Sequence, residues 1–192
     1  MPAYSLICNR LPRIENEDKM TNIGKEHWYA LYVRMHHEKK TAEILQQLGC
    51  QCFLPVQEVV RQWSDRKKKV KVIVIPMIVF VRCTEKRRVE LLNILPSVVG
   101  TLMDRCTKKP AIIRDEEMNT FMFMLDSCEG AVNFSESDLV KGEIVEVVKG
   151  PLKGLKGELI EVEKKSQVQV RIDCLGVASV EVPIECLKKV DR

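Results

Sequence analysis

Residues 70–81 of the chain read Val-Lys-Val-Ile-Val-Ile-Pro-Met-Ile-Val-Phe-Val, an almost wholly apolar and β-branched stretch. A continuous apolar run of this kind is typical of a strand buried in a sheet that helices cover. Pro76 has no N–H to donate to a neighbouring strand, so a single strand is not expected to pass straight through it. We therefore predict an edge strand or hairpin arm over 70–75, a break at Pro76, and a core strand over 77–81. The run is too short to span a bilayer, which needs about 20 apolar residues.

Strands and helices alternate on both sides of this stretch. The aromatic and β-branched residues 27–34 predict one strand, and residues 50–60 predict another that is interrupted at a proline. Apolar residues at helical spacing predict three helices, over 38–49, 85–95 and 115–125, and Gly49 stands where a helix C-cap belongs. The expected apolar set of the second helix is Val89, Leu91, Leu92 and Leu95, and a short strand is expected over 98–103. This order predicts a compact α+β or α/β sandwich.

The composition changes after the third predicted helix. Residues 125–138 are rich in Ser, Glu, Gly and Asn, which predicts a polar linker. Beyond it, four short runs alternate apolar with polar residues, at 143–148, 158–162, 167–172 and 177–182. Turn residues separate these runs at the spacing of a small β-barrel. We predict an N-terminal extension (1–26), a first domain (27–126), a linker (127–138) and a β-barrel domain (139–192).

The bulk composition excludes several classes of function. The net charge of this 192-residue chain is only +4, so any contact with nucleic acid is expected to be local. The eight cysteines are dispersed with no C-x-x-C pair, so we expect reduced thiols and no metal site. His36 and His37 precede a helix without a nucleophile–base constellation, and there is no phosphate-binding loop. The first residues lack a secretion signal, so we expect a cytoplasmic protein with no membrane contact and no cofactor.

A basic segment lies between the two extended runs that flank it. Its candidate nucleic-acid-binding residues are Arg61, Trp63, Arg66, Lys67, Lys68 and Lys69. One interpretation is the tip of a hairpin that neutralises phosphates and stacks a base on Trp63. The other is a solvated hairpin loop with Trp63 folded against its base. Both stay open at this point.

Residues 147–159 carry a motif, Val-Val-Lys-Gly-Pro-Leu-Lys-Gly-Leu-Lys-Gly-Glu-Leu, that resembles the KOW motif of transcription and translation proteins. In this motif Gly150 and Pro151 are expected to form a tight turn. Gly157 is expected to supply a backbone conformation that other residues disfavour.

The first domain is similar to the N-terminal (NGN) domain of NusG, and this resemblance implies an α+β protein whose N-terminal α/β sandwich has an antiparallel sheet flanked by helices. The residues that carry this resemblance are Trp28-Tyr29-Ala30-Leu31-Tyr32, a following Glu-Lys-Lys helix, Leu54-Pro55, and Pro76-Met77-Ile78-Val79-Phe80-Val81. In NusG an NGN domain is followed by a linker and a KOW domain, and this chain has the same order. The segment 61–68 further resembles the UpxY-type paralogues that act on capsular-polysaccharide operons.

This resemblance implies a monomeric transcription elongation factor or antiterminator without enzymatic activity. It implies binding to the β′ clamp helices of RNA polymerase through an apolar patch, for which the candidates are Tyr29, Tyr32, Ile78 and Phe80. The domain then bridges the polymerase cleft and suppresses pausing or termination, with the basic hairpin near upstream or non-template DNA. The alternative function is a KOW-bearing protein associated with ribosomes or RNA, and an enzyme ranks third.

Two positions depart from the family pattern. The family's Pro-Gly-Tyr stands here as Pro76-Met77-Ile78, and loss of the ring is expected to weaken docking by about 1–3 kcal/mol. The Ile-Phe-Gly-Arg turn, through which general NusG contacts a ribosomal protein and Rho, stands here as residues 174–177, with Leu175 in place of the aromatic residue. Leu175 is therefore the candidate partner-binding residue of the KOW domain, and whether the partner is a ribosomal protein or another factor stays open. The altered turn at residues 174–177 favours a specialised antiterminator over the general NusG factor.

Overall fold

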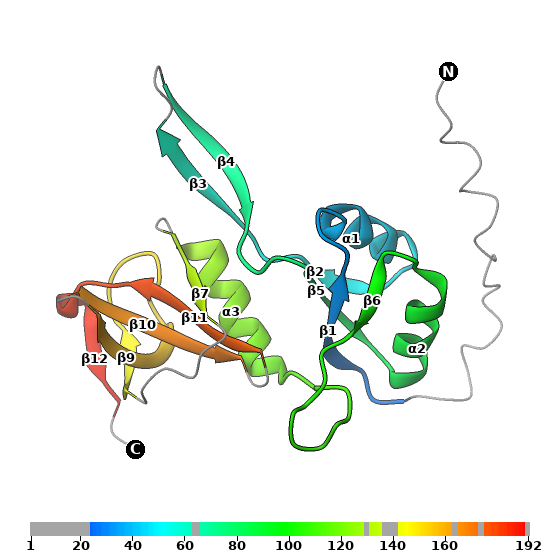
Figure 1. The fold of residues 1–192 in the computed structure, drawn as a ribbon. Helices are drawn as coiled ribbons and strands as arrows, with labels where there is room; N and C mark the ends of the chain where they lie inside the picture. Colours follow the sequence, from blue (N-terminus) through cyan, green and yellow to red (C-terminus); the bar gives the residue numbers. More distant parts are fainter. Residues whose placement is uncertain are drawn as a thin grey trace.

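The computed structural model describes residues 24–62, 66–128, 131–135, 142–162, 165–172 and 175–190 (Figure 1). In these ranges it contains three α-helices and only antiparallel strand pairs, which confirms the predicted α+β class. No helix within the same ranges is long and apolar enough to cross a bilayer.

The N-terminal sheet has four strands in the order β2-β5-β1-β6. They are β1 (His27–Val33), β2 (Gln51–Phe53), β5 (Ile78–Cys83) and β6 (Val98–Thr101). Strand β5 pairs with both β1 and β2, and Val79, Phe80 and Val81 have no solvent exposure. The apolar run thus forms the predicted core strand, because a strand with neighbours on both edges and cover on both faces favours apolar residues throughout.

Helices and the C-terminal part of the chain cover opposite faces of this sheet. Helices α1 (Glu38–Gln47) and α2 (Glu85–Ile94) pack on the face that carries Leu31 and Val79. Helix α3 (Asp115–Ser127) packs on the face that carries Ala30 and Phe80, where its apolar side chains join one continuous core with those of the C-terminal strands (Figure 1). This helix therefore lies between the two parts of the molecule.

One residue of the predicted apolar set of α2 is not buried. Val89 is 44% exposed, whereas Leu91 and Leu95 are in the core as predicted. Arg88 is buried beside them, and its guanidinium donates to Glu85 (2.9 Å from Nε) and to Thr101 (2.9 Å from Nη1). The helical spacing alone did not indicate that a charged side chain faces inward, because its burial depends on these partners.

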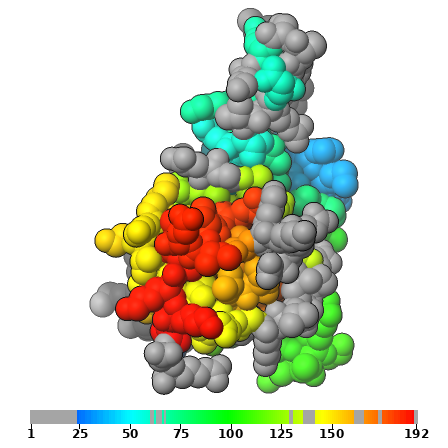
Figure 2. All heavy atoms as spheres, turned by 90° about the vertical axis from the view of Figure 1, so that its left-hand side faces the viewer, coloured from blue at the N-terminus to red at the C-terminus, as the bar shows by residue number. Residues whose placement is uncertain are grey.

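Strands β3 (Val56–Gln62) and β4 (Lys67–Ile73) form a separate two-stranded hairpin. It projects away from both parts of the molecule (Figures 1 and 2). Its pairing runs from Val56↔Ile73 out to Gln62↔Lys67. The predicted polar loop over 61–69 was therefore too long: most of the basic residues lie on the strands, since backbone pairing in a projecting ribbon needs no apolar side chains. Trp63 lies outside the described residues.

The C-terminal strands form an antiparallel sheet in the order β12-β8-β9-β10-β11-β7. The bounds are β7 (Asn133–Ser135), β8 (Glu143–Val147), β9 (Lys156–Val162), β10 (Lys165–Ile172), β11 (Gly176–Glu181) and β12 (Leu187–Lys189), with a 3₁₀ turn at Ile184–Cys186. All four predicted strands are present. Strand β7 lies within the predicted linker and pairs with β11 through Phe134↔Ala178. Three residues are too few to reveal an alternating pattern, so the sequence did not indicate this strand.

The glycines of the KOW-like motif have two different roles. Gly150 has a left-handed φ of +86° and its carbonyl accepts from Lys153 (3.1 Å), so it opens the predicted turn with Pro151. Gly157 lies within β9 and does not have a left-handed φ. A Cβ at this position would be 2.4 Å from the carbonyl oxygen of Gln169 on the neighbouring strand. The predicted reason for this glycine was wrong: it is required for close strand approach and not for its backbone conformation.

Substitution of Gly157 by alanine is expected to destabilise the C-terminal domain by about 1–3 kcal/mol, because the strands must move apart to admit a methyl group. The matched control is Gly100→Ala, where an added Cβ has no neighbour within 4 Å. Urea unfolding of both variants measures the effect. Equal stability of the two variants would contradict the steric account.

Candidate functional site

A cavity of about 570 Å³ lies where strands β1 and β5 meet the C-terminal domain. The N-terminal sheet supplies Tyr32 and Ile78 to its wall, and the C-terminal part supplies Phe134 and Leu175. Further wall residues are Thr101, at the end of β6, and residues of the two connections beside the sheet: Val74, Ile75, Pro76, Met77, Leu102, Met103 and Arg105. The site is mostly apolar, with Arg105 as its cation.

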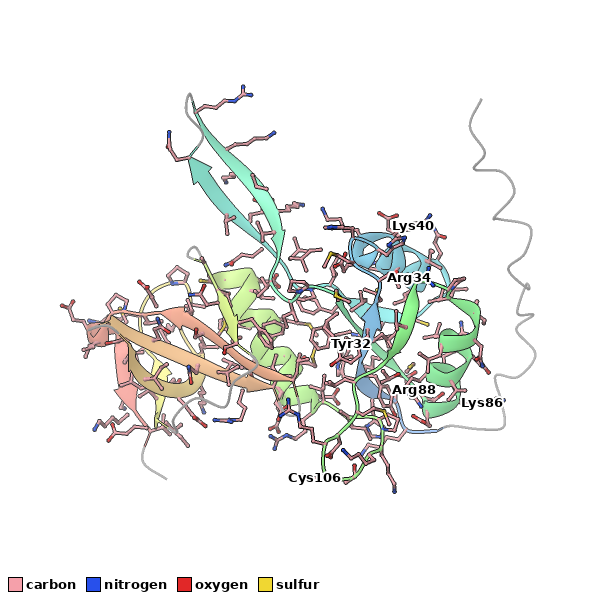
Figure 3. The ribbon with its side chains drawn as sticks, in the orientation of Figure 1. Tyr32, Arg34, Lys40, Lys86, Arg88 and Cys106 are labelled. Atoms are coloured by element: carbon pink, nitrogen blue, oxygen red, sulfur yellow. The ribbon has the colours of Figure 1, made fainter. Side chains whose placement is uncertain are left out.

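Tyr32 is placed at this cavity by the alternation of strand β1. Trp28 and Ala30 point to the same face and are buried in the core that α3 joins, whereas Tyr32 is 39% exposed near the end of the strand. Its cross-strand partner is Ile78, which is buried. Figure 3 shows Tyr32 near the middle of the molecule, between the sheet and the C-terminal domain. An exposed aromatic ring beside buried apolar residues is a typical anchor for a protein partner.

The turn before β5 forms one rim of the cavity. Met77 has a left-handed φ of 61°, a conformation that glycine adopts more readily, and this is the position of the family's glycine. Its N–H donates to a carboxylate oxygen of Glu38 (3.0 Å), and its carbonyl accepts from the N–H of Val33 (2.9 Å). Glu38 is only 3% exposed. The sequence indicated Glu38 only as the first residue of a helix, because its partner lies far along the chain.

Glu38→Ala is expected to lower the free energy of unfolding by about 1–3 kcal/mol, since it leaves the Met77 N–H without its acceptor. Glu38→Gln keeps an acceptor oxygen at the same place and is the matched control. Thermal and urea unfolding measure both variants. If glutamine proves as harmful as alanine, the hydrogen bond to Met77 is not the reason for this buried acid.

The structure does not bring together all four residues that the resemblance assigned to polymerase. Tyr32 and Ile78 share the cavity. Tyr29 faces the opposite side of the sheet, where the Arg88 guanidinium lies 5.7 Å from its ring centroid. Burial raises the pKa of Tyr29, and the hydrogen bond from Arg88 lowers the pKa of the neighbouring Glu85. Tyr29 is thus part of a packed polar network.

Phe80 is a core residue of the face that α3 covers. Its ring centroid lies 6.2 Å from that of Phe53 and 6.1 Å from that of Phe121 on α3. The rings of Phe80 and Phe121 meet edge to face and those of Phe80 and Phe53 are tilted, and such aromatic pairs stabilise packing beyond their apolar area. In this arrangement Phe80 holds α3 to the sheet.

The hairpin carries the predicted nucleic-acid-binding residues along its length. Arg66, Lys68 and Lys69 are exposed, and Arg61 and Lys67 lie on strands β3 and β4. Lys71 is close enough to Glu58 for a weak surface ion pair (3.8 Å). A projecting ribbon with exposed cations fits a phosphate backbone.

Leu175 lies in the connection between β10 and β11, where its N–H donates to the carbonyl of Ile172 (3.1 Å). Its side chain is half-buried and lines the same cavity as Tyr32. The buried N–H of Val132 donates to the side-chain oxygen of Gln57 (2.9 Å), which joins the base of the hairpin to the segment before β7. Two candidate sites that are far apart in the sequence therefore face each other.

No group of three or more His, Cys, Asp or Glu residues in the described part of the chain is arranged to hold a metal ion. The ring of His37 contacts the carbonyl of Met35 (3.1 Å) and does not meet a carboxylate–nucleophile pair.

The site combines a cavity lined by an exposed aromatic ring with a projecting hairpin that carries exposed cations. Residues 26–122, half of the chain, match the family model described as "Transcription termination factor nusG". The chain belongs to the NusG family of transcription factors. A search of curated proteins gave no match.

Solved structures of related proteins are similar at low sequence identity. The structure titled "Domain interaction in Thermotoga maritima NusG" is 18% identical, with 87% of this chain and 98% of that chain covered and a TM-score of 0.49. Two conformations of the MjSpt4:Spt5 complex follow. Conformation A is 20% identical, covers 86% of this chain and 99% of that chain, and has a TM-score of 0.28. Conformation B is 19% identical, covers 86% of this chain and 97% of that chain, and has a TM-score of 0.29.

Proposed function

We propose that this protein is a transcription elongation factor that binds RNA polymerase through the surface around Tyr32, Met77 and Ile78. The partner is the helical tip of the β′ clamp, as the resemblance to NusG implies. The observation that carries the proposal is the exposed ring of Tyr32 beside the buried Ile78, within the part of the chain that matches the family. Of the four residues first assigned to this role, Tyr32 and Ile78 keep it as contacts, and Tyr29 and Phe80 support the sheet from its two faces.

The chemistry of this surface suits a helical partner. Tyr32, Met77 and Met103 are exposed, large and apolar, and Met side chains adapt to irregular surfaces. A helix that lays apolar side chains against them gains most of its binding energy from a few desolvated contacts. Arg105 at the rim is placed to meet an acidic residue on the partner.

The C-terminal domain restricts this surface in the present arrangement. A helix with its side chains is about 10–12 Å across, so a helical tip does not fit while Phe134 and Leu175 close the cavity. We infer that the two domains separate when polymerase binds. Strand β7 stays with the C-terminal sheet, so the part of the predicted linker (127–138) that precedes β7 connects the two domains. The freed surface around Leu175 then takes a second partner, either a ribosomal protein or another factor.

Leu175→Glu is expected to tighten binding to polymerase about tenfold, because a carboxylate in the apolar wall disfavours the closed arrangement. Ile184→Glu is the matched control, since Ile184 is 68% exposed on the same domain. Binding of each folded variant to an assembled elongation complex measures the effect. Equal affinity of the two variants would contradict the separation of the domains.

The exposed cations of the hairpin support a contact with upstream or non-template DNA during elongation. Suppression of pausing or termination at particular operons, as in the UpxY type, is supported by the basic pattern of residues 61–68. The hairpin equally favours the second candidate function, which is association with ribosomes or RNA. Co-sedimentation with polymerase or with ribosomal particles separates the two.

The direct test of the function is an elongation assay on a pausing template. Wild-type protein is expected to shorten pauses, and Tyr32→Asp is expected to leave them unchanged. Val99→Asp, an exposed position on the edge strand β6, is the control that keeps activity. Unchanged pausing with the wild-type protein and with Leu175→Glu would exclude the proposal.

A further inference from the structure

Three free thiols lie on the face of the N-terminal sheet that α1 and α2 cover. Cys83 is buried at the end of β5, Cys52 lies in β2, and Cys50 immediately precedes β2. Cys83 belongs to the core cluster of this face, and the two half-buried thiols pack against that cluster. This face is opposite to the one that carries Tyr32.

Cys50 lies next to Cys83. Strands β2 and β5 are antiparallel, with Gln51 opposite Arg82 and Cys52 opposite Val81, and the paired register ends at Gln51. Continued by one residue beyond β2, this register sets Cys50 opposite Cys83, and Cys50 is near enough to contribute to the raised pKa of Cys83. The Cα atoms of opposed residues in antiparallel strands are about 4.5–5.5 Å apart, which falls within the span of a disulfide, about 4.4–6.8 Å. Cys52 has another partner, because its thiol donates to the carbonyl of Ala42 (3.4 Å).

The chain around Cys50 is held in place. Its N–H donates to the carbonyl of Leu45 (3.0 Å) at the end of α1, after the left-handed Gly49. Arg87 of α2 donates to the carbonyl of Leu48 (3.2 Å) and lies beside the Cys50 thiol. These contacts fasten the connection between α1 and β2 to the start of α2, which directly follows Cys83 and Thr84.

Exposure gives the two thiols different roles. Burial raises the pKa of Cys83 to about 12, so this thiol stays protonated at neutral pH. Cys50 is half-buried and is the one that small solutes reach first. A redox-sensing cysteine is typically reachable from solvent and often lies next to a second, resolving cysteine.

We propose that Cys50 and Cys83 form a redox modification site whose substrate is a hydroperoxide. The Cys50 thiolate attacks a peroxide oxygen and the O–O bond breaks. Cys50 becomes a sulfenic acid, and the leaving oxygen takes up a proton and departs as water or an alcohol. The Cys83 sulfur then attacks the Cys50 sulfur, the S–O bond breaks, and the hydroxyl leaves with the Cys83 proton as water. The peroxide is reduced and both thiols are oxidised to one disulfide, and a dithiol reductant then restores the two thiols by thiol–disulfide exchange.

The disulfide joins the end of α1 to the start of α2 and restrains the unfolded chain. The oxidised protein is therefore expected to unfold at a temperature about 5–10 °C higher than the reduced protein. Binding to polymerase is expected to stay the same, because the cross-link lies on the face away from Tyr32. A negative result for this redox site would therefore leave the proposed polymerase binding unaffected, and a failure of polymerase binding would leave the redox site unaffected.

The test treats the full-length protein with hydrogen peroxide, blocks the remaining thiols by alkylation and maps the peptides by mass spectrometry. The expected product is a peptide that links Cys50 to Cys83, absent in Cys50→Ser and retained in Cys106→Ser, an exposed control. In Cys83→Ala the sulfenic acid on Cys50 is expected to persist and to react with a dione probe.

Three results would overturn the proposal in the folded wild-type protein. One is a Cys50–Cys52 link as the main product, and another is over-oxidation of Cys50 without any cross-link. The third is a protein in which both thiols remain reduced while Cys106 is oxidised. The wild-type map decides even where a Cys83 variant fails to fold.

Discussion

Phe80→Ala is expected to lower the free energy of unfolding by about 3–5 kcal/mol, the range for removing a fully buried aromatic side chain. Phe80 has no solvent exposure and contacts Phe53 from β2 and Phe121 from α3. Removal of its ring leaves a cavity between the sheet and the helix that leads into the C-terminal domain. The variant is therefore expected to lose the attachment of α3 as well as stability.

Phe123→Ala is the matched control, because Phe123 lies on the same helix and is 38% exposed. Its expected cost is below about 1 kcal/mol. Urea unfolding followed by circular dichroism measures both. If Phe80→Ala proves as stable as Phe123→Ala, Phe80 is not a core residue and belongs again among the candidate polymerase contacts.

Neutralisation of the hairpin is expected to produce the largest change in nucleic-acid binding. In the combined variant Arg66→Gln, Lys68→Gln, Lys69→Gln and Lys71→Gln, four exposed cations are lost from one projecting ribbon. If each contacts a phosphate of single-stranded DNA, the slope of log affinity against log salt concentration falls by about 3. Titration of a labelled oligonucleotide at several salt concentrations gives this slope.

The control for the hairpin variant removes the same charge elsewhere. It combines Lys39→Gln, Lys40→Gln, Lys86→Gln and Lys109→Gln, all exposed and outside the hairpin. If the DNA contacts the hairpin alone, the salt-dependence slope of this control variant is expected to stay close to that of the wild type. Equal losses in the two variants would mean that overall charge attracts the DNA, and that the hairpin has no special part.

The sequence predicted the architecture well where local pattern decides structure. The β-branched run around Val79 became the core strand, and Gly49 ends α1 with the expected left-handed φ of +74°. Strand β7 and the inward-facing Arg88 were not predicted. Both depend on partners from elsewhere in the fold, Ala178 for the strand and Thr101 for the arginine, and sequence spacing does not reveal such partners.

The polymerase-binding role of the candidate site stays a prediction. Tyr32 and Ile78, two of the four residues that the resemblance assigned to polymerase, both line the cavity. Tyr29 and Tyr32 are three residues apart on one strand, so the alternation of side chains already placed them on opposite faces. The proximity of Leu175 to Tyr32 was beyond sequence reasoning, because it depends on how the C-terminal domain packs against the sheet.

The most direct test of the central proposal is binding to an isolated β′ clamp-helix fragment, measured by calorimetry. Wild-type protein and Val99→Asp are expected to bind with equal affinity, Leu175→Glu more tightly, and Tyr32→Asp at least about 30-fold more weakly, as for loss of an interface anchor. Tyr32→Asp must retain the unfolding transition of the wild type. Wild-type affinity in a folded Tyr32→Asp variant, or no binding by Leu175→Glu to either the fragment or an assembled elongation complex, would contradict a polymerase site at Tyr32.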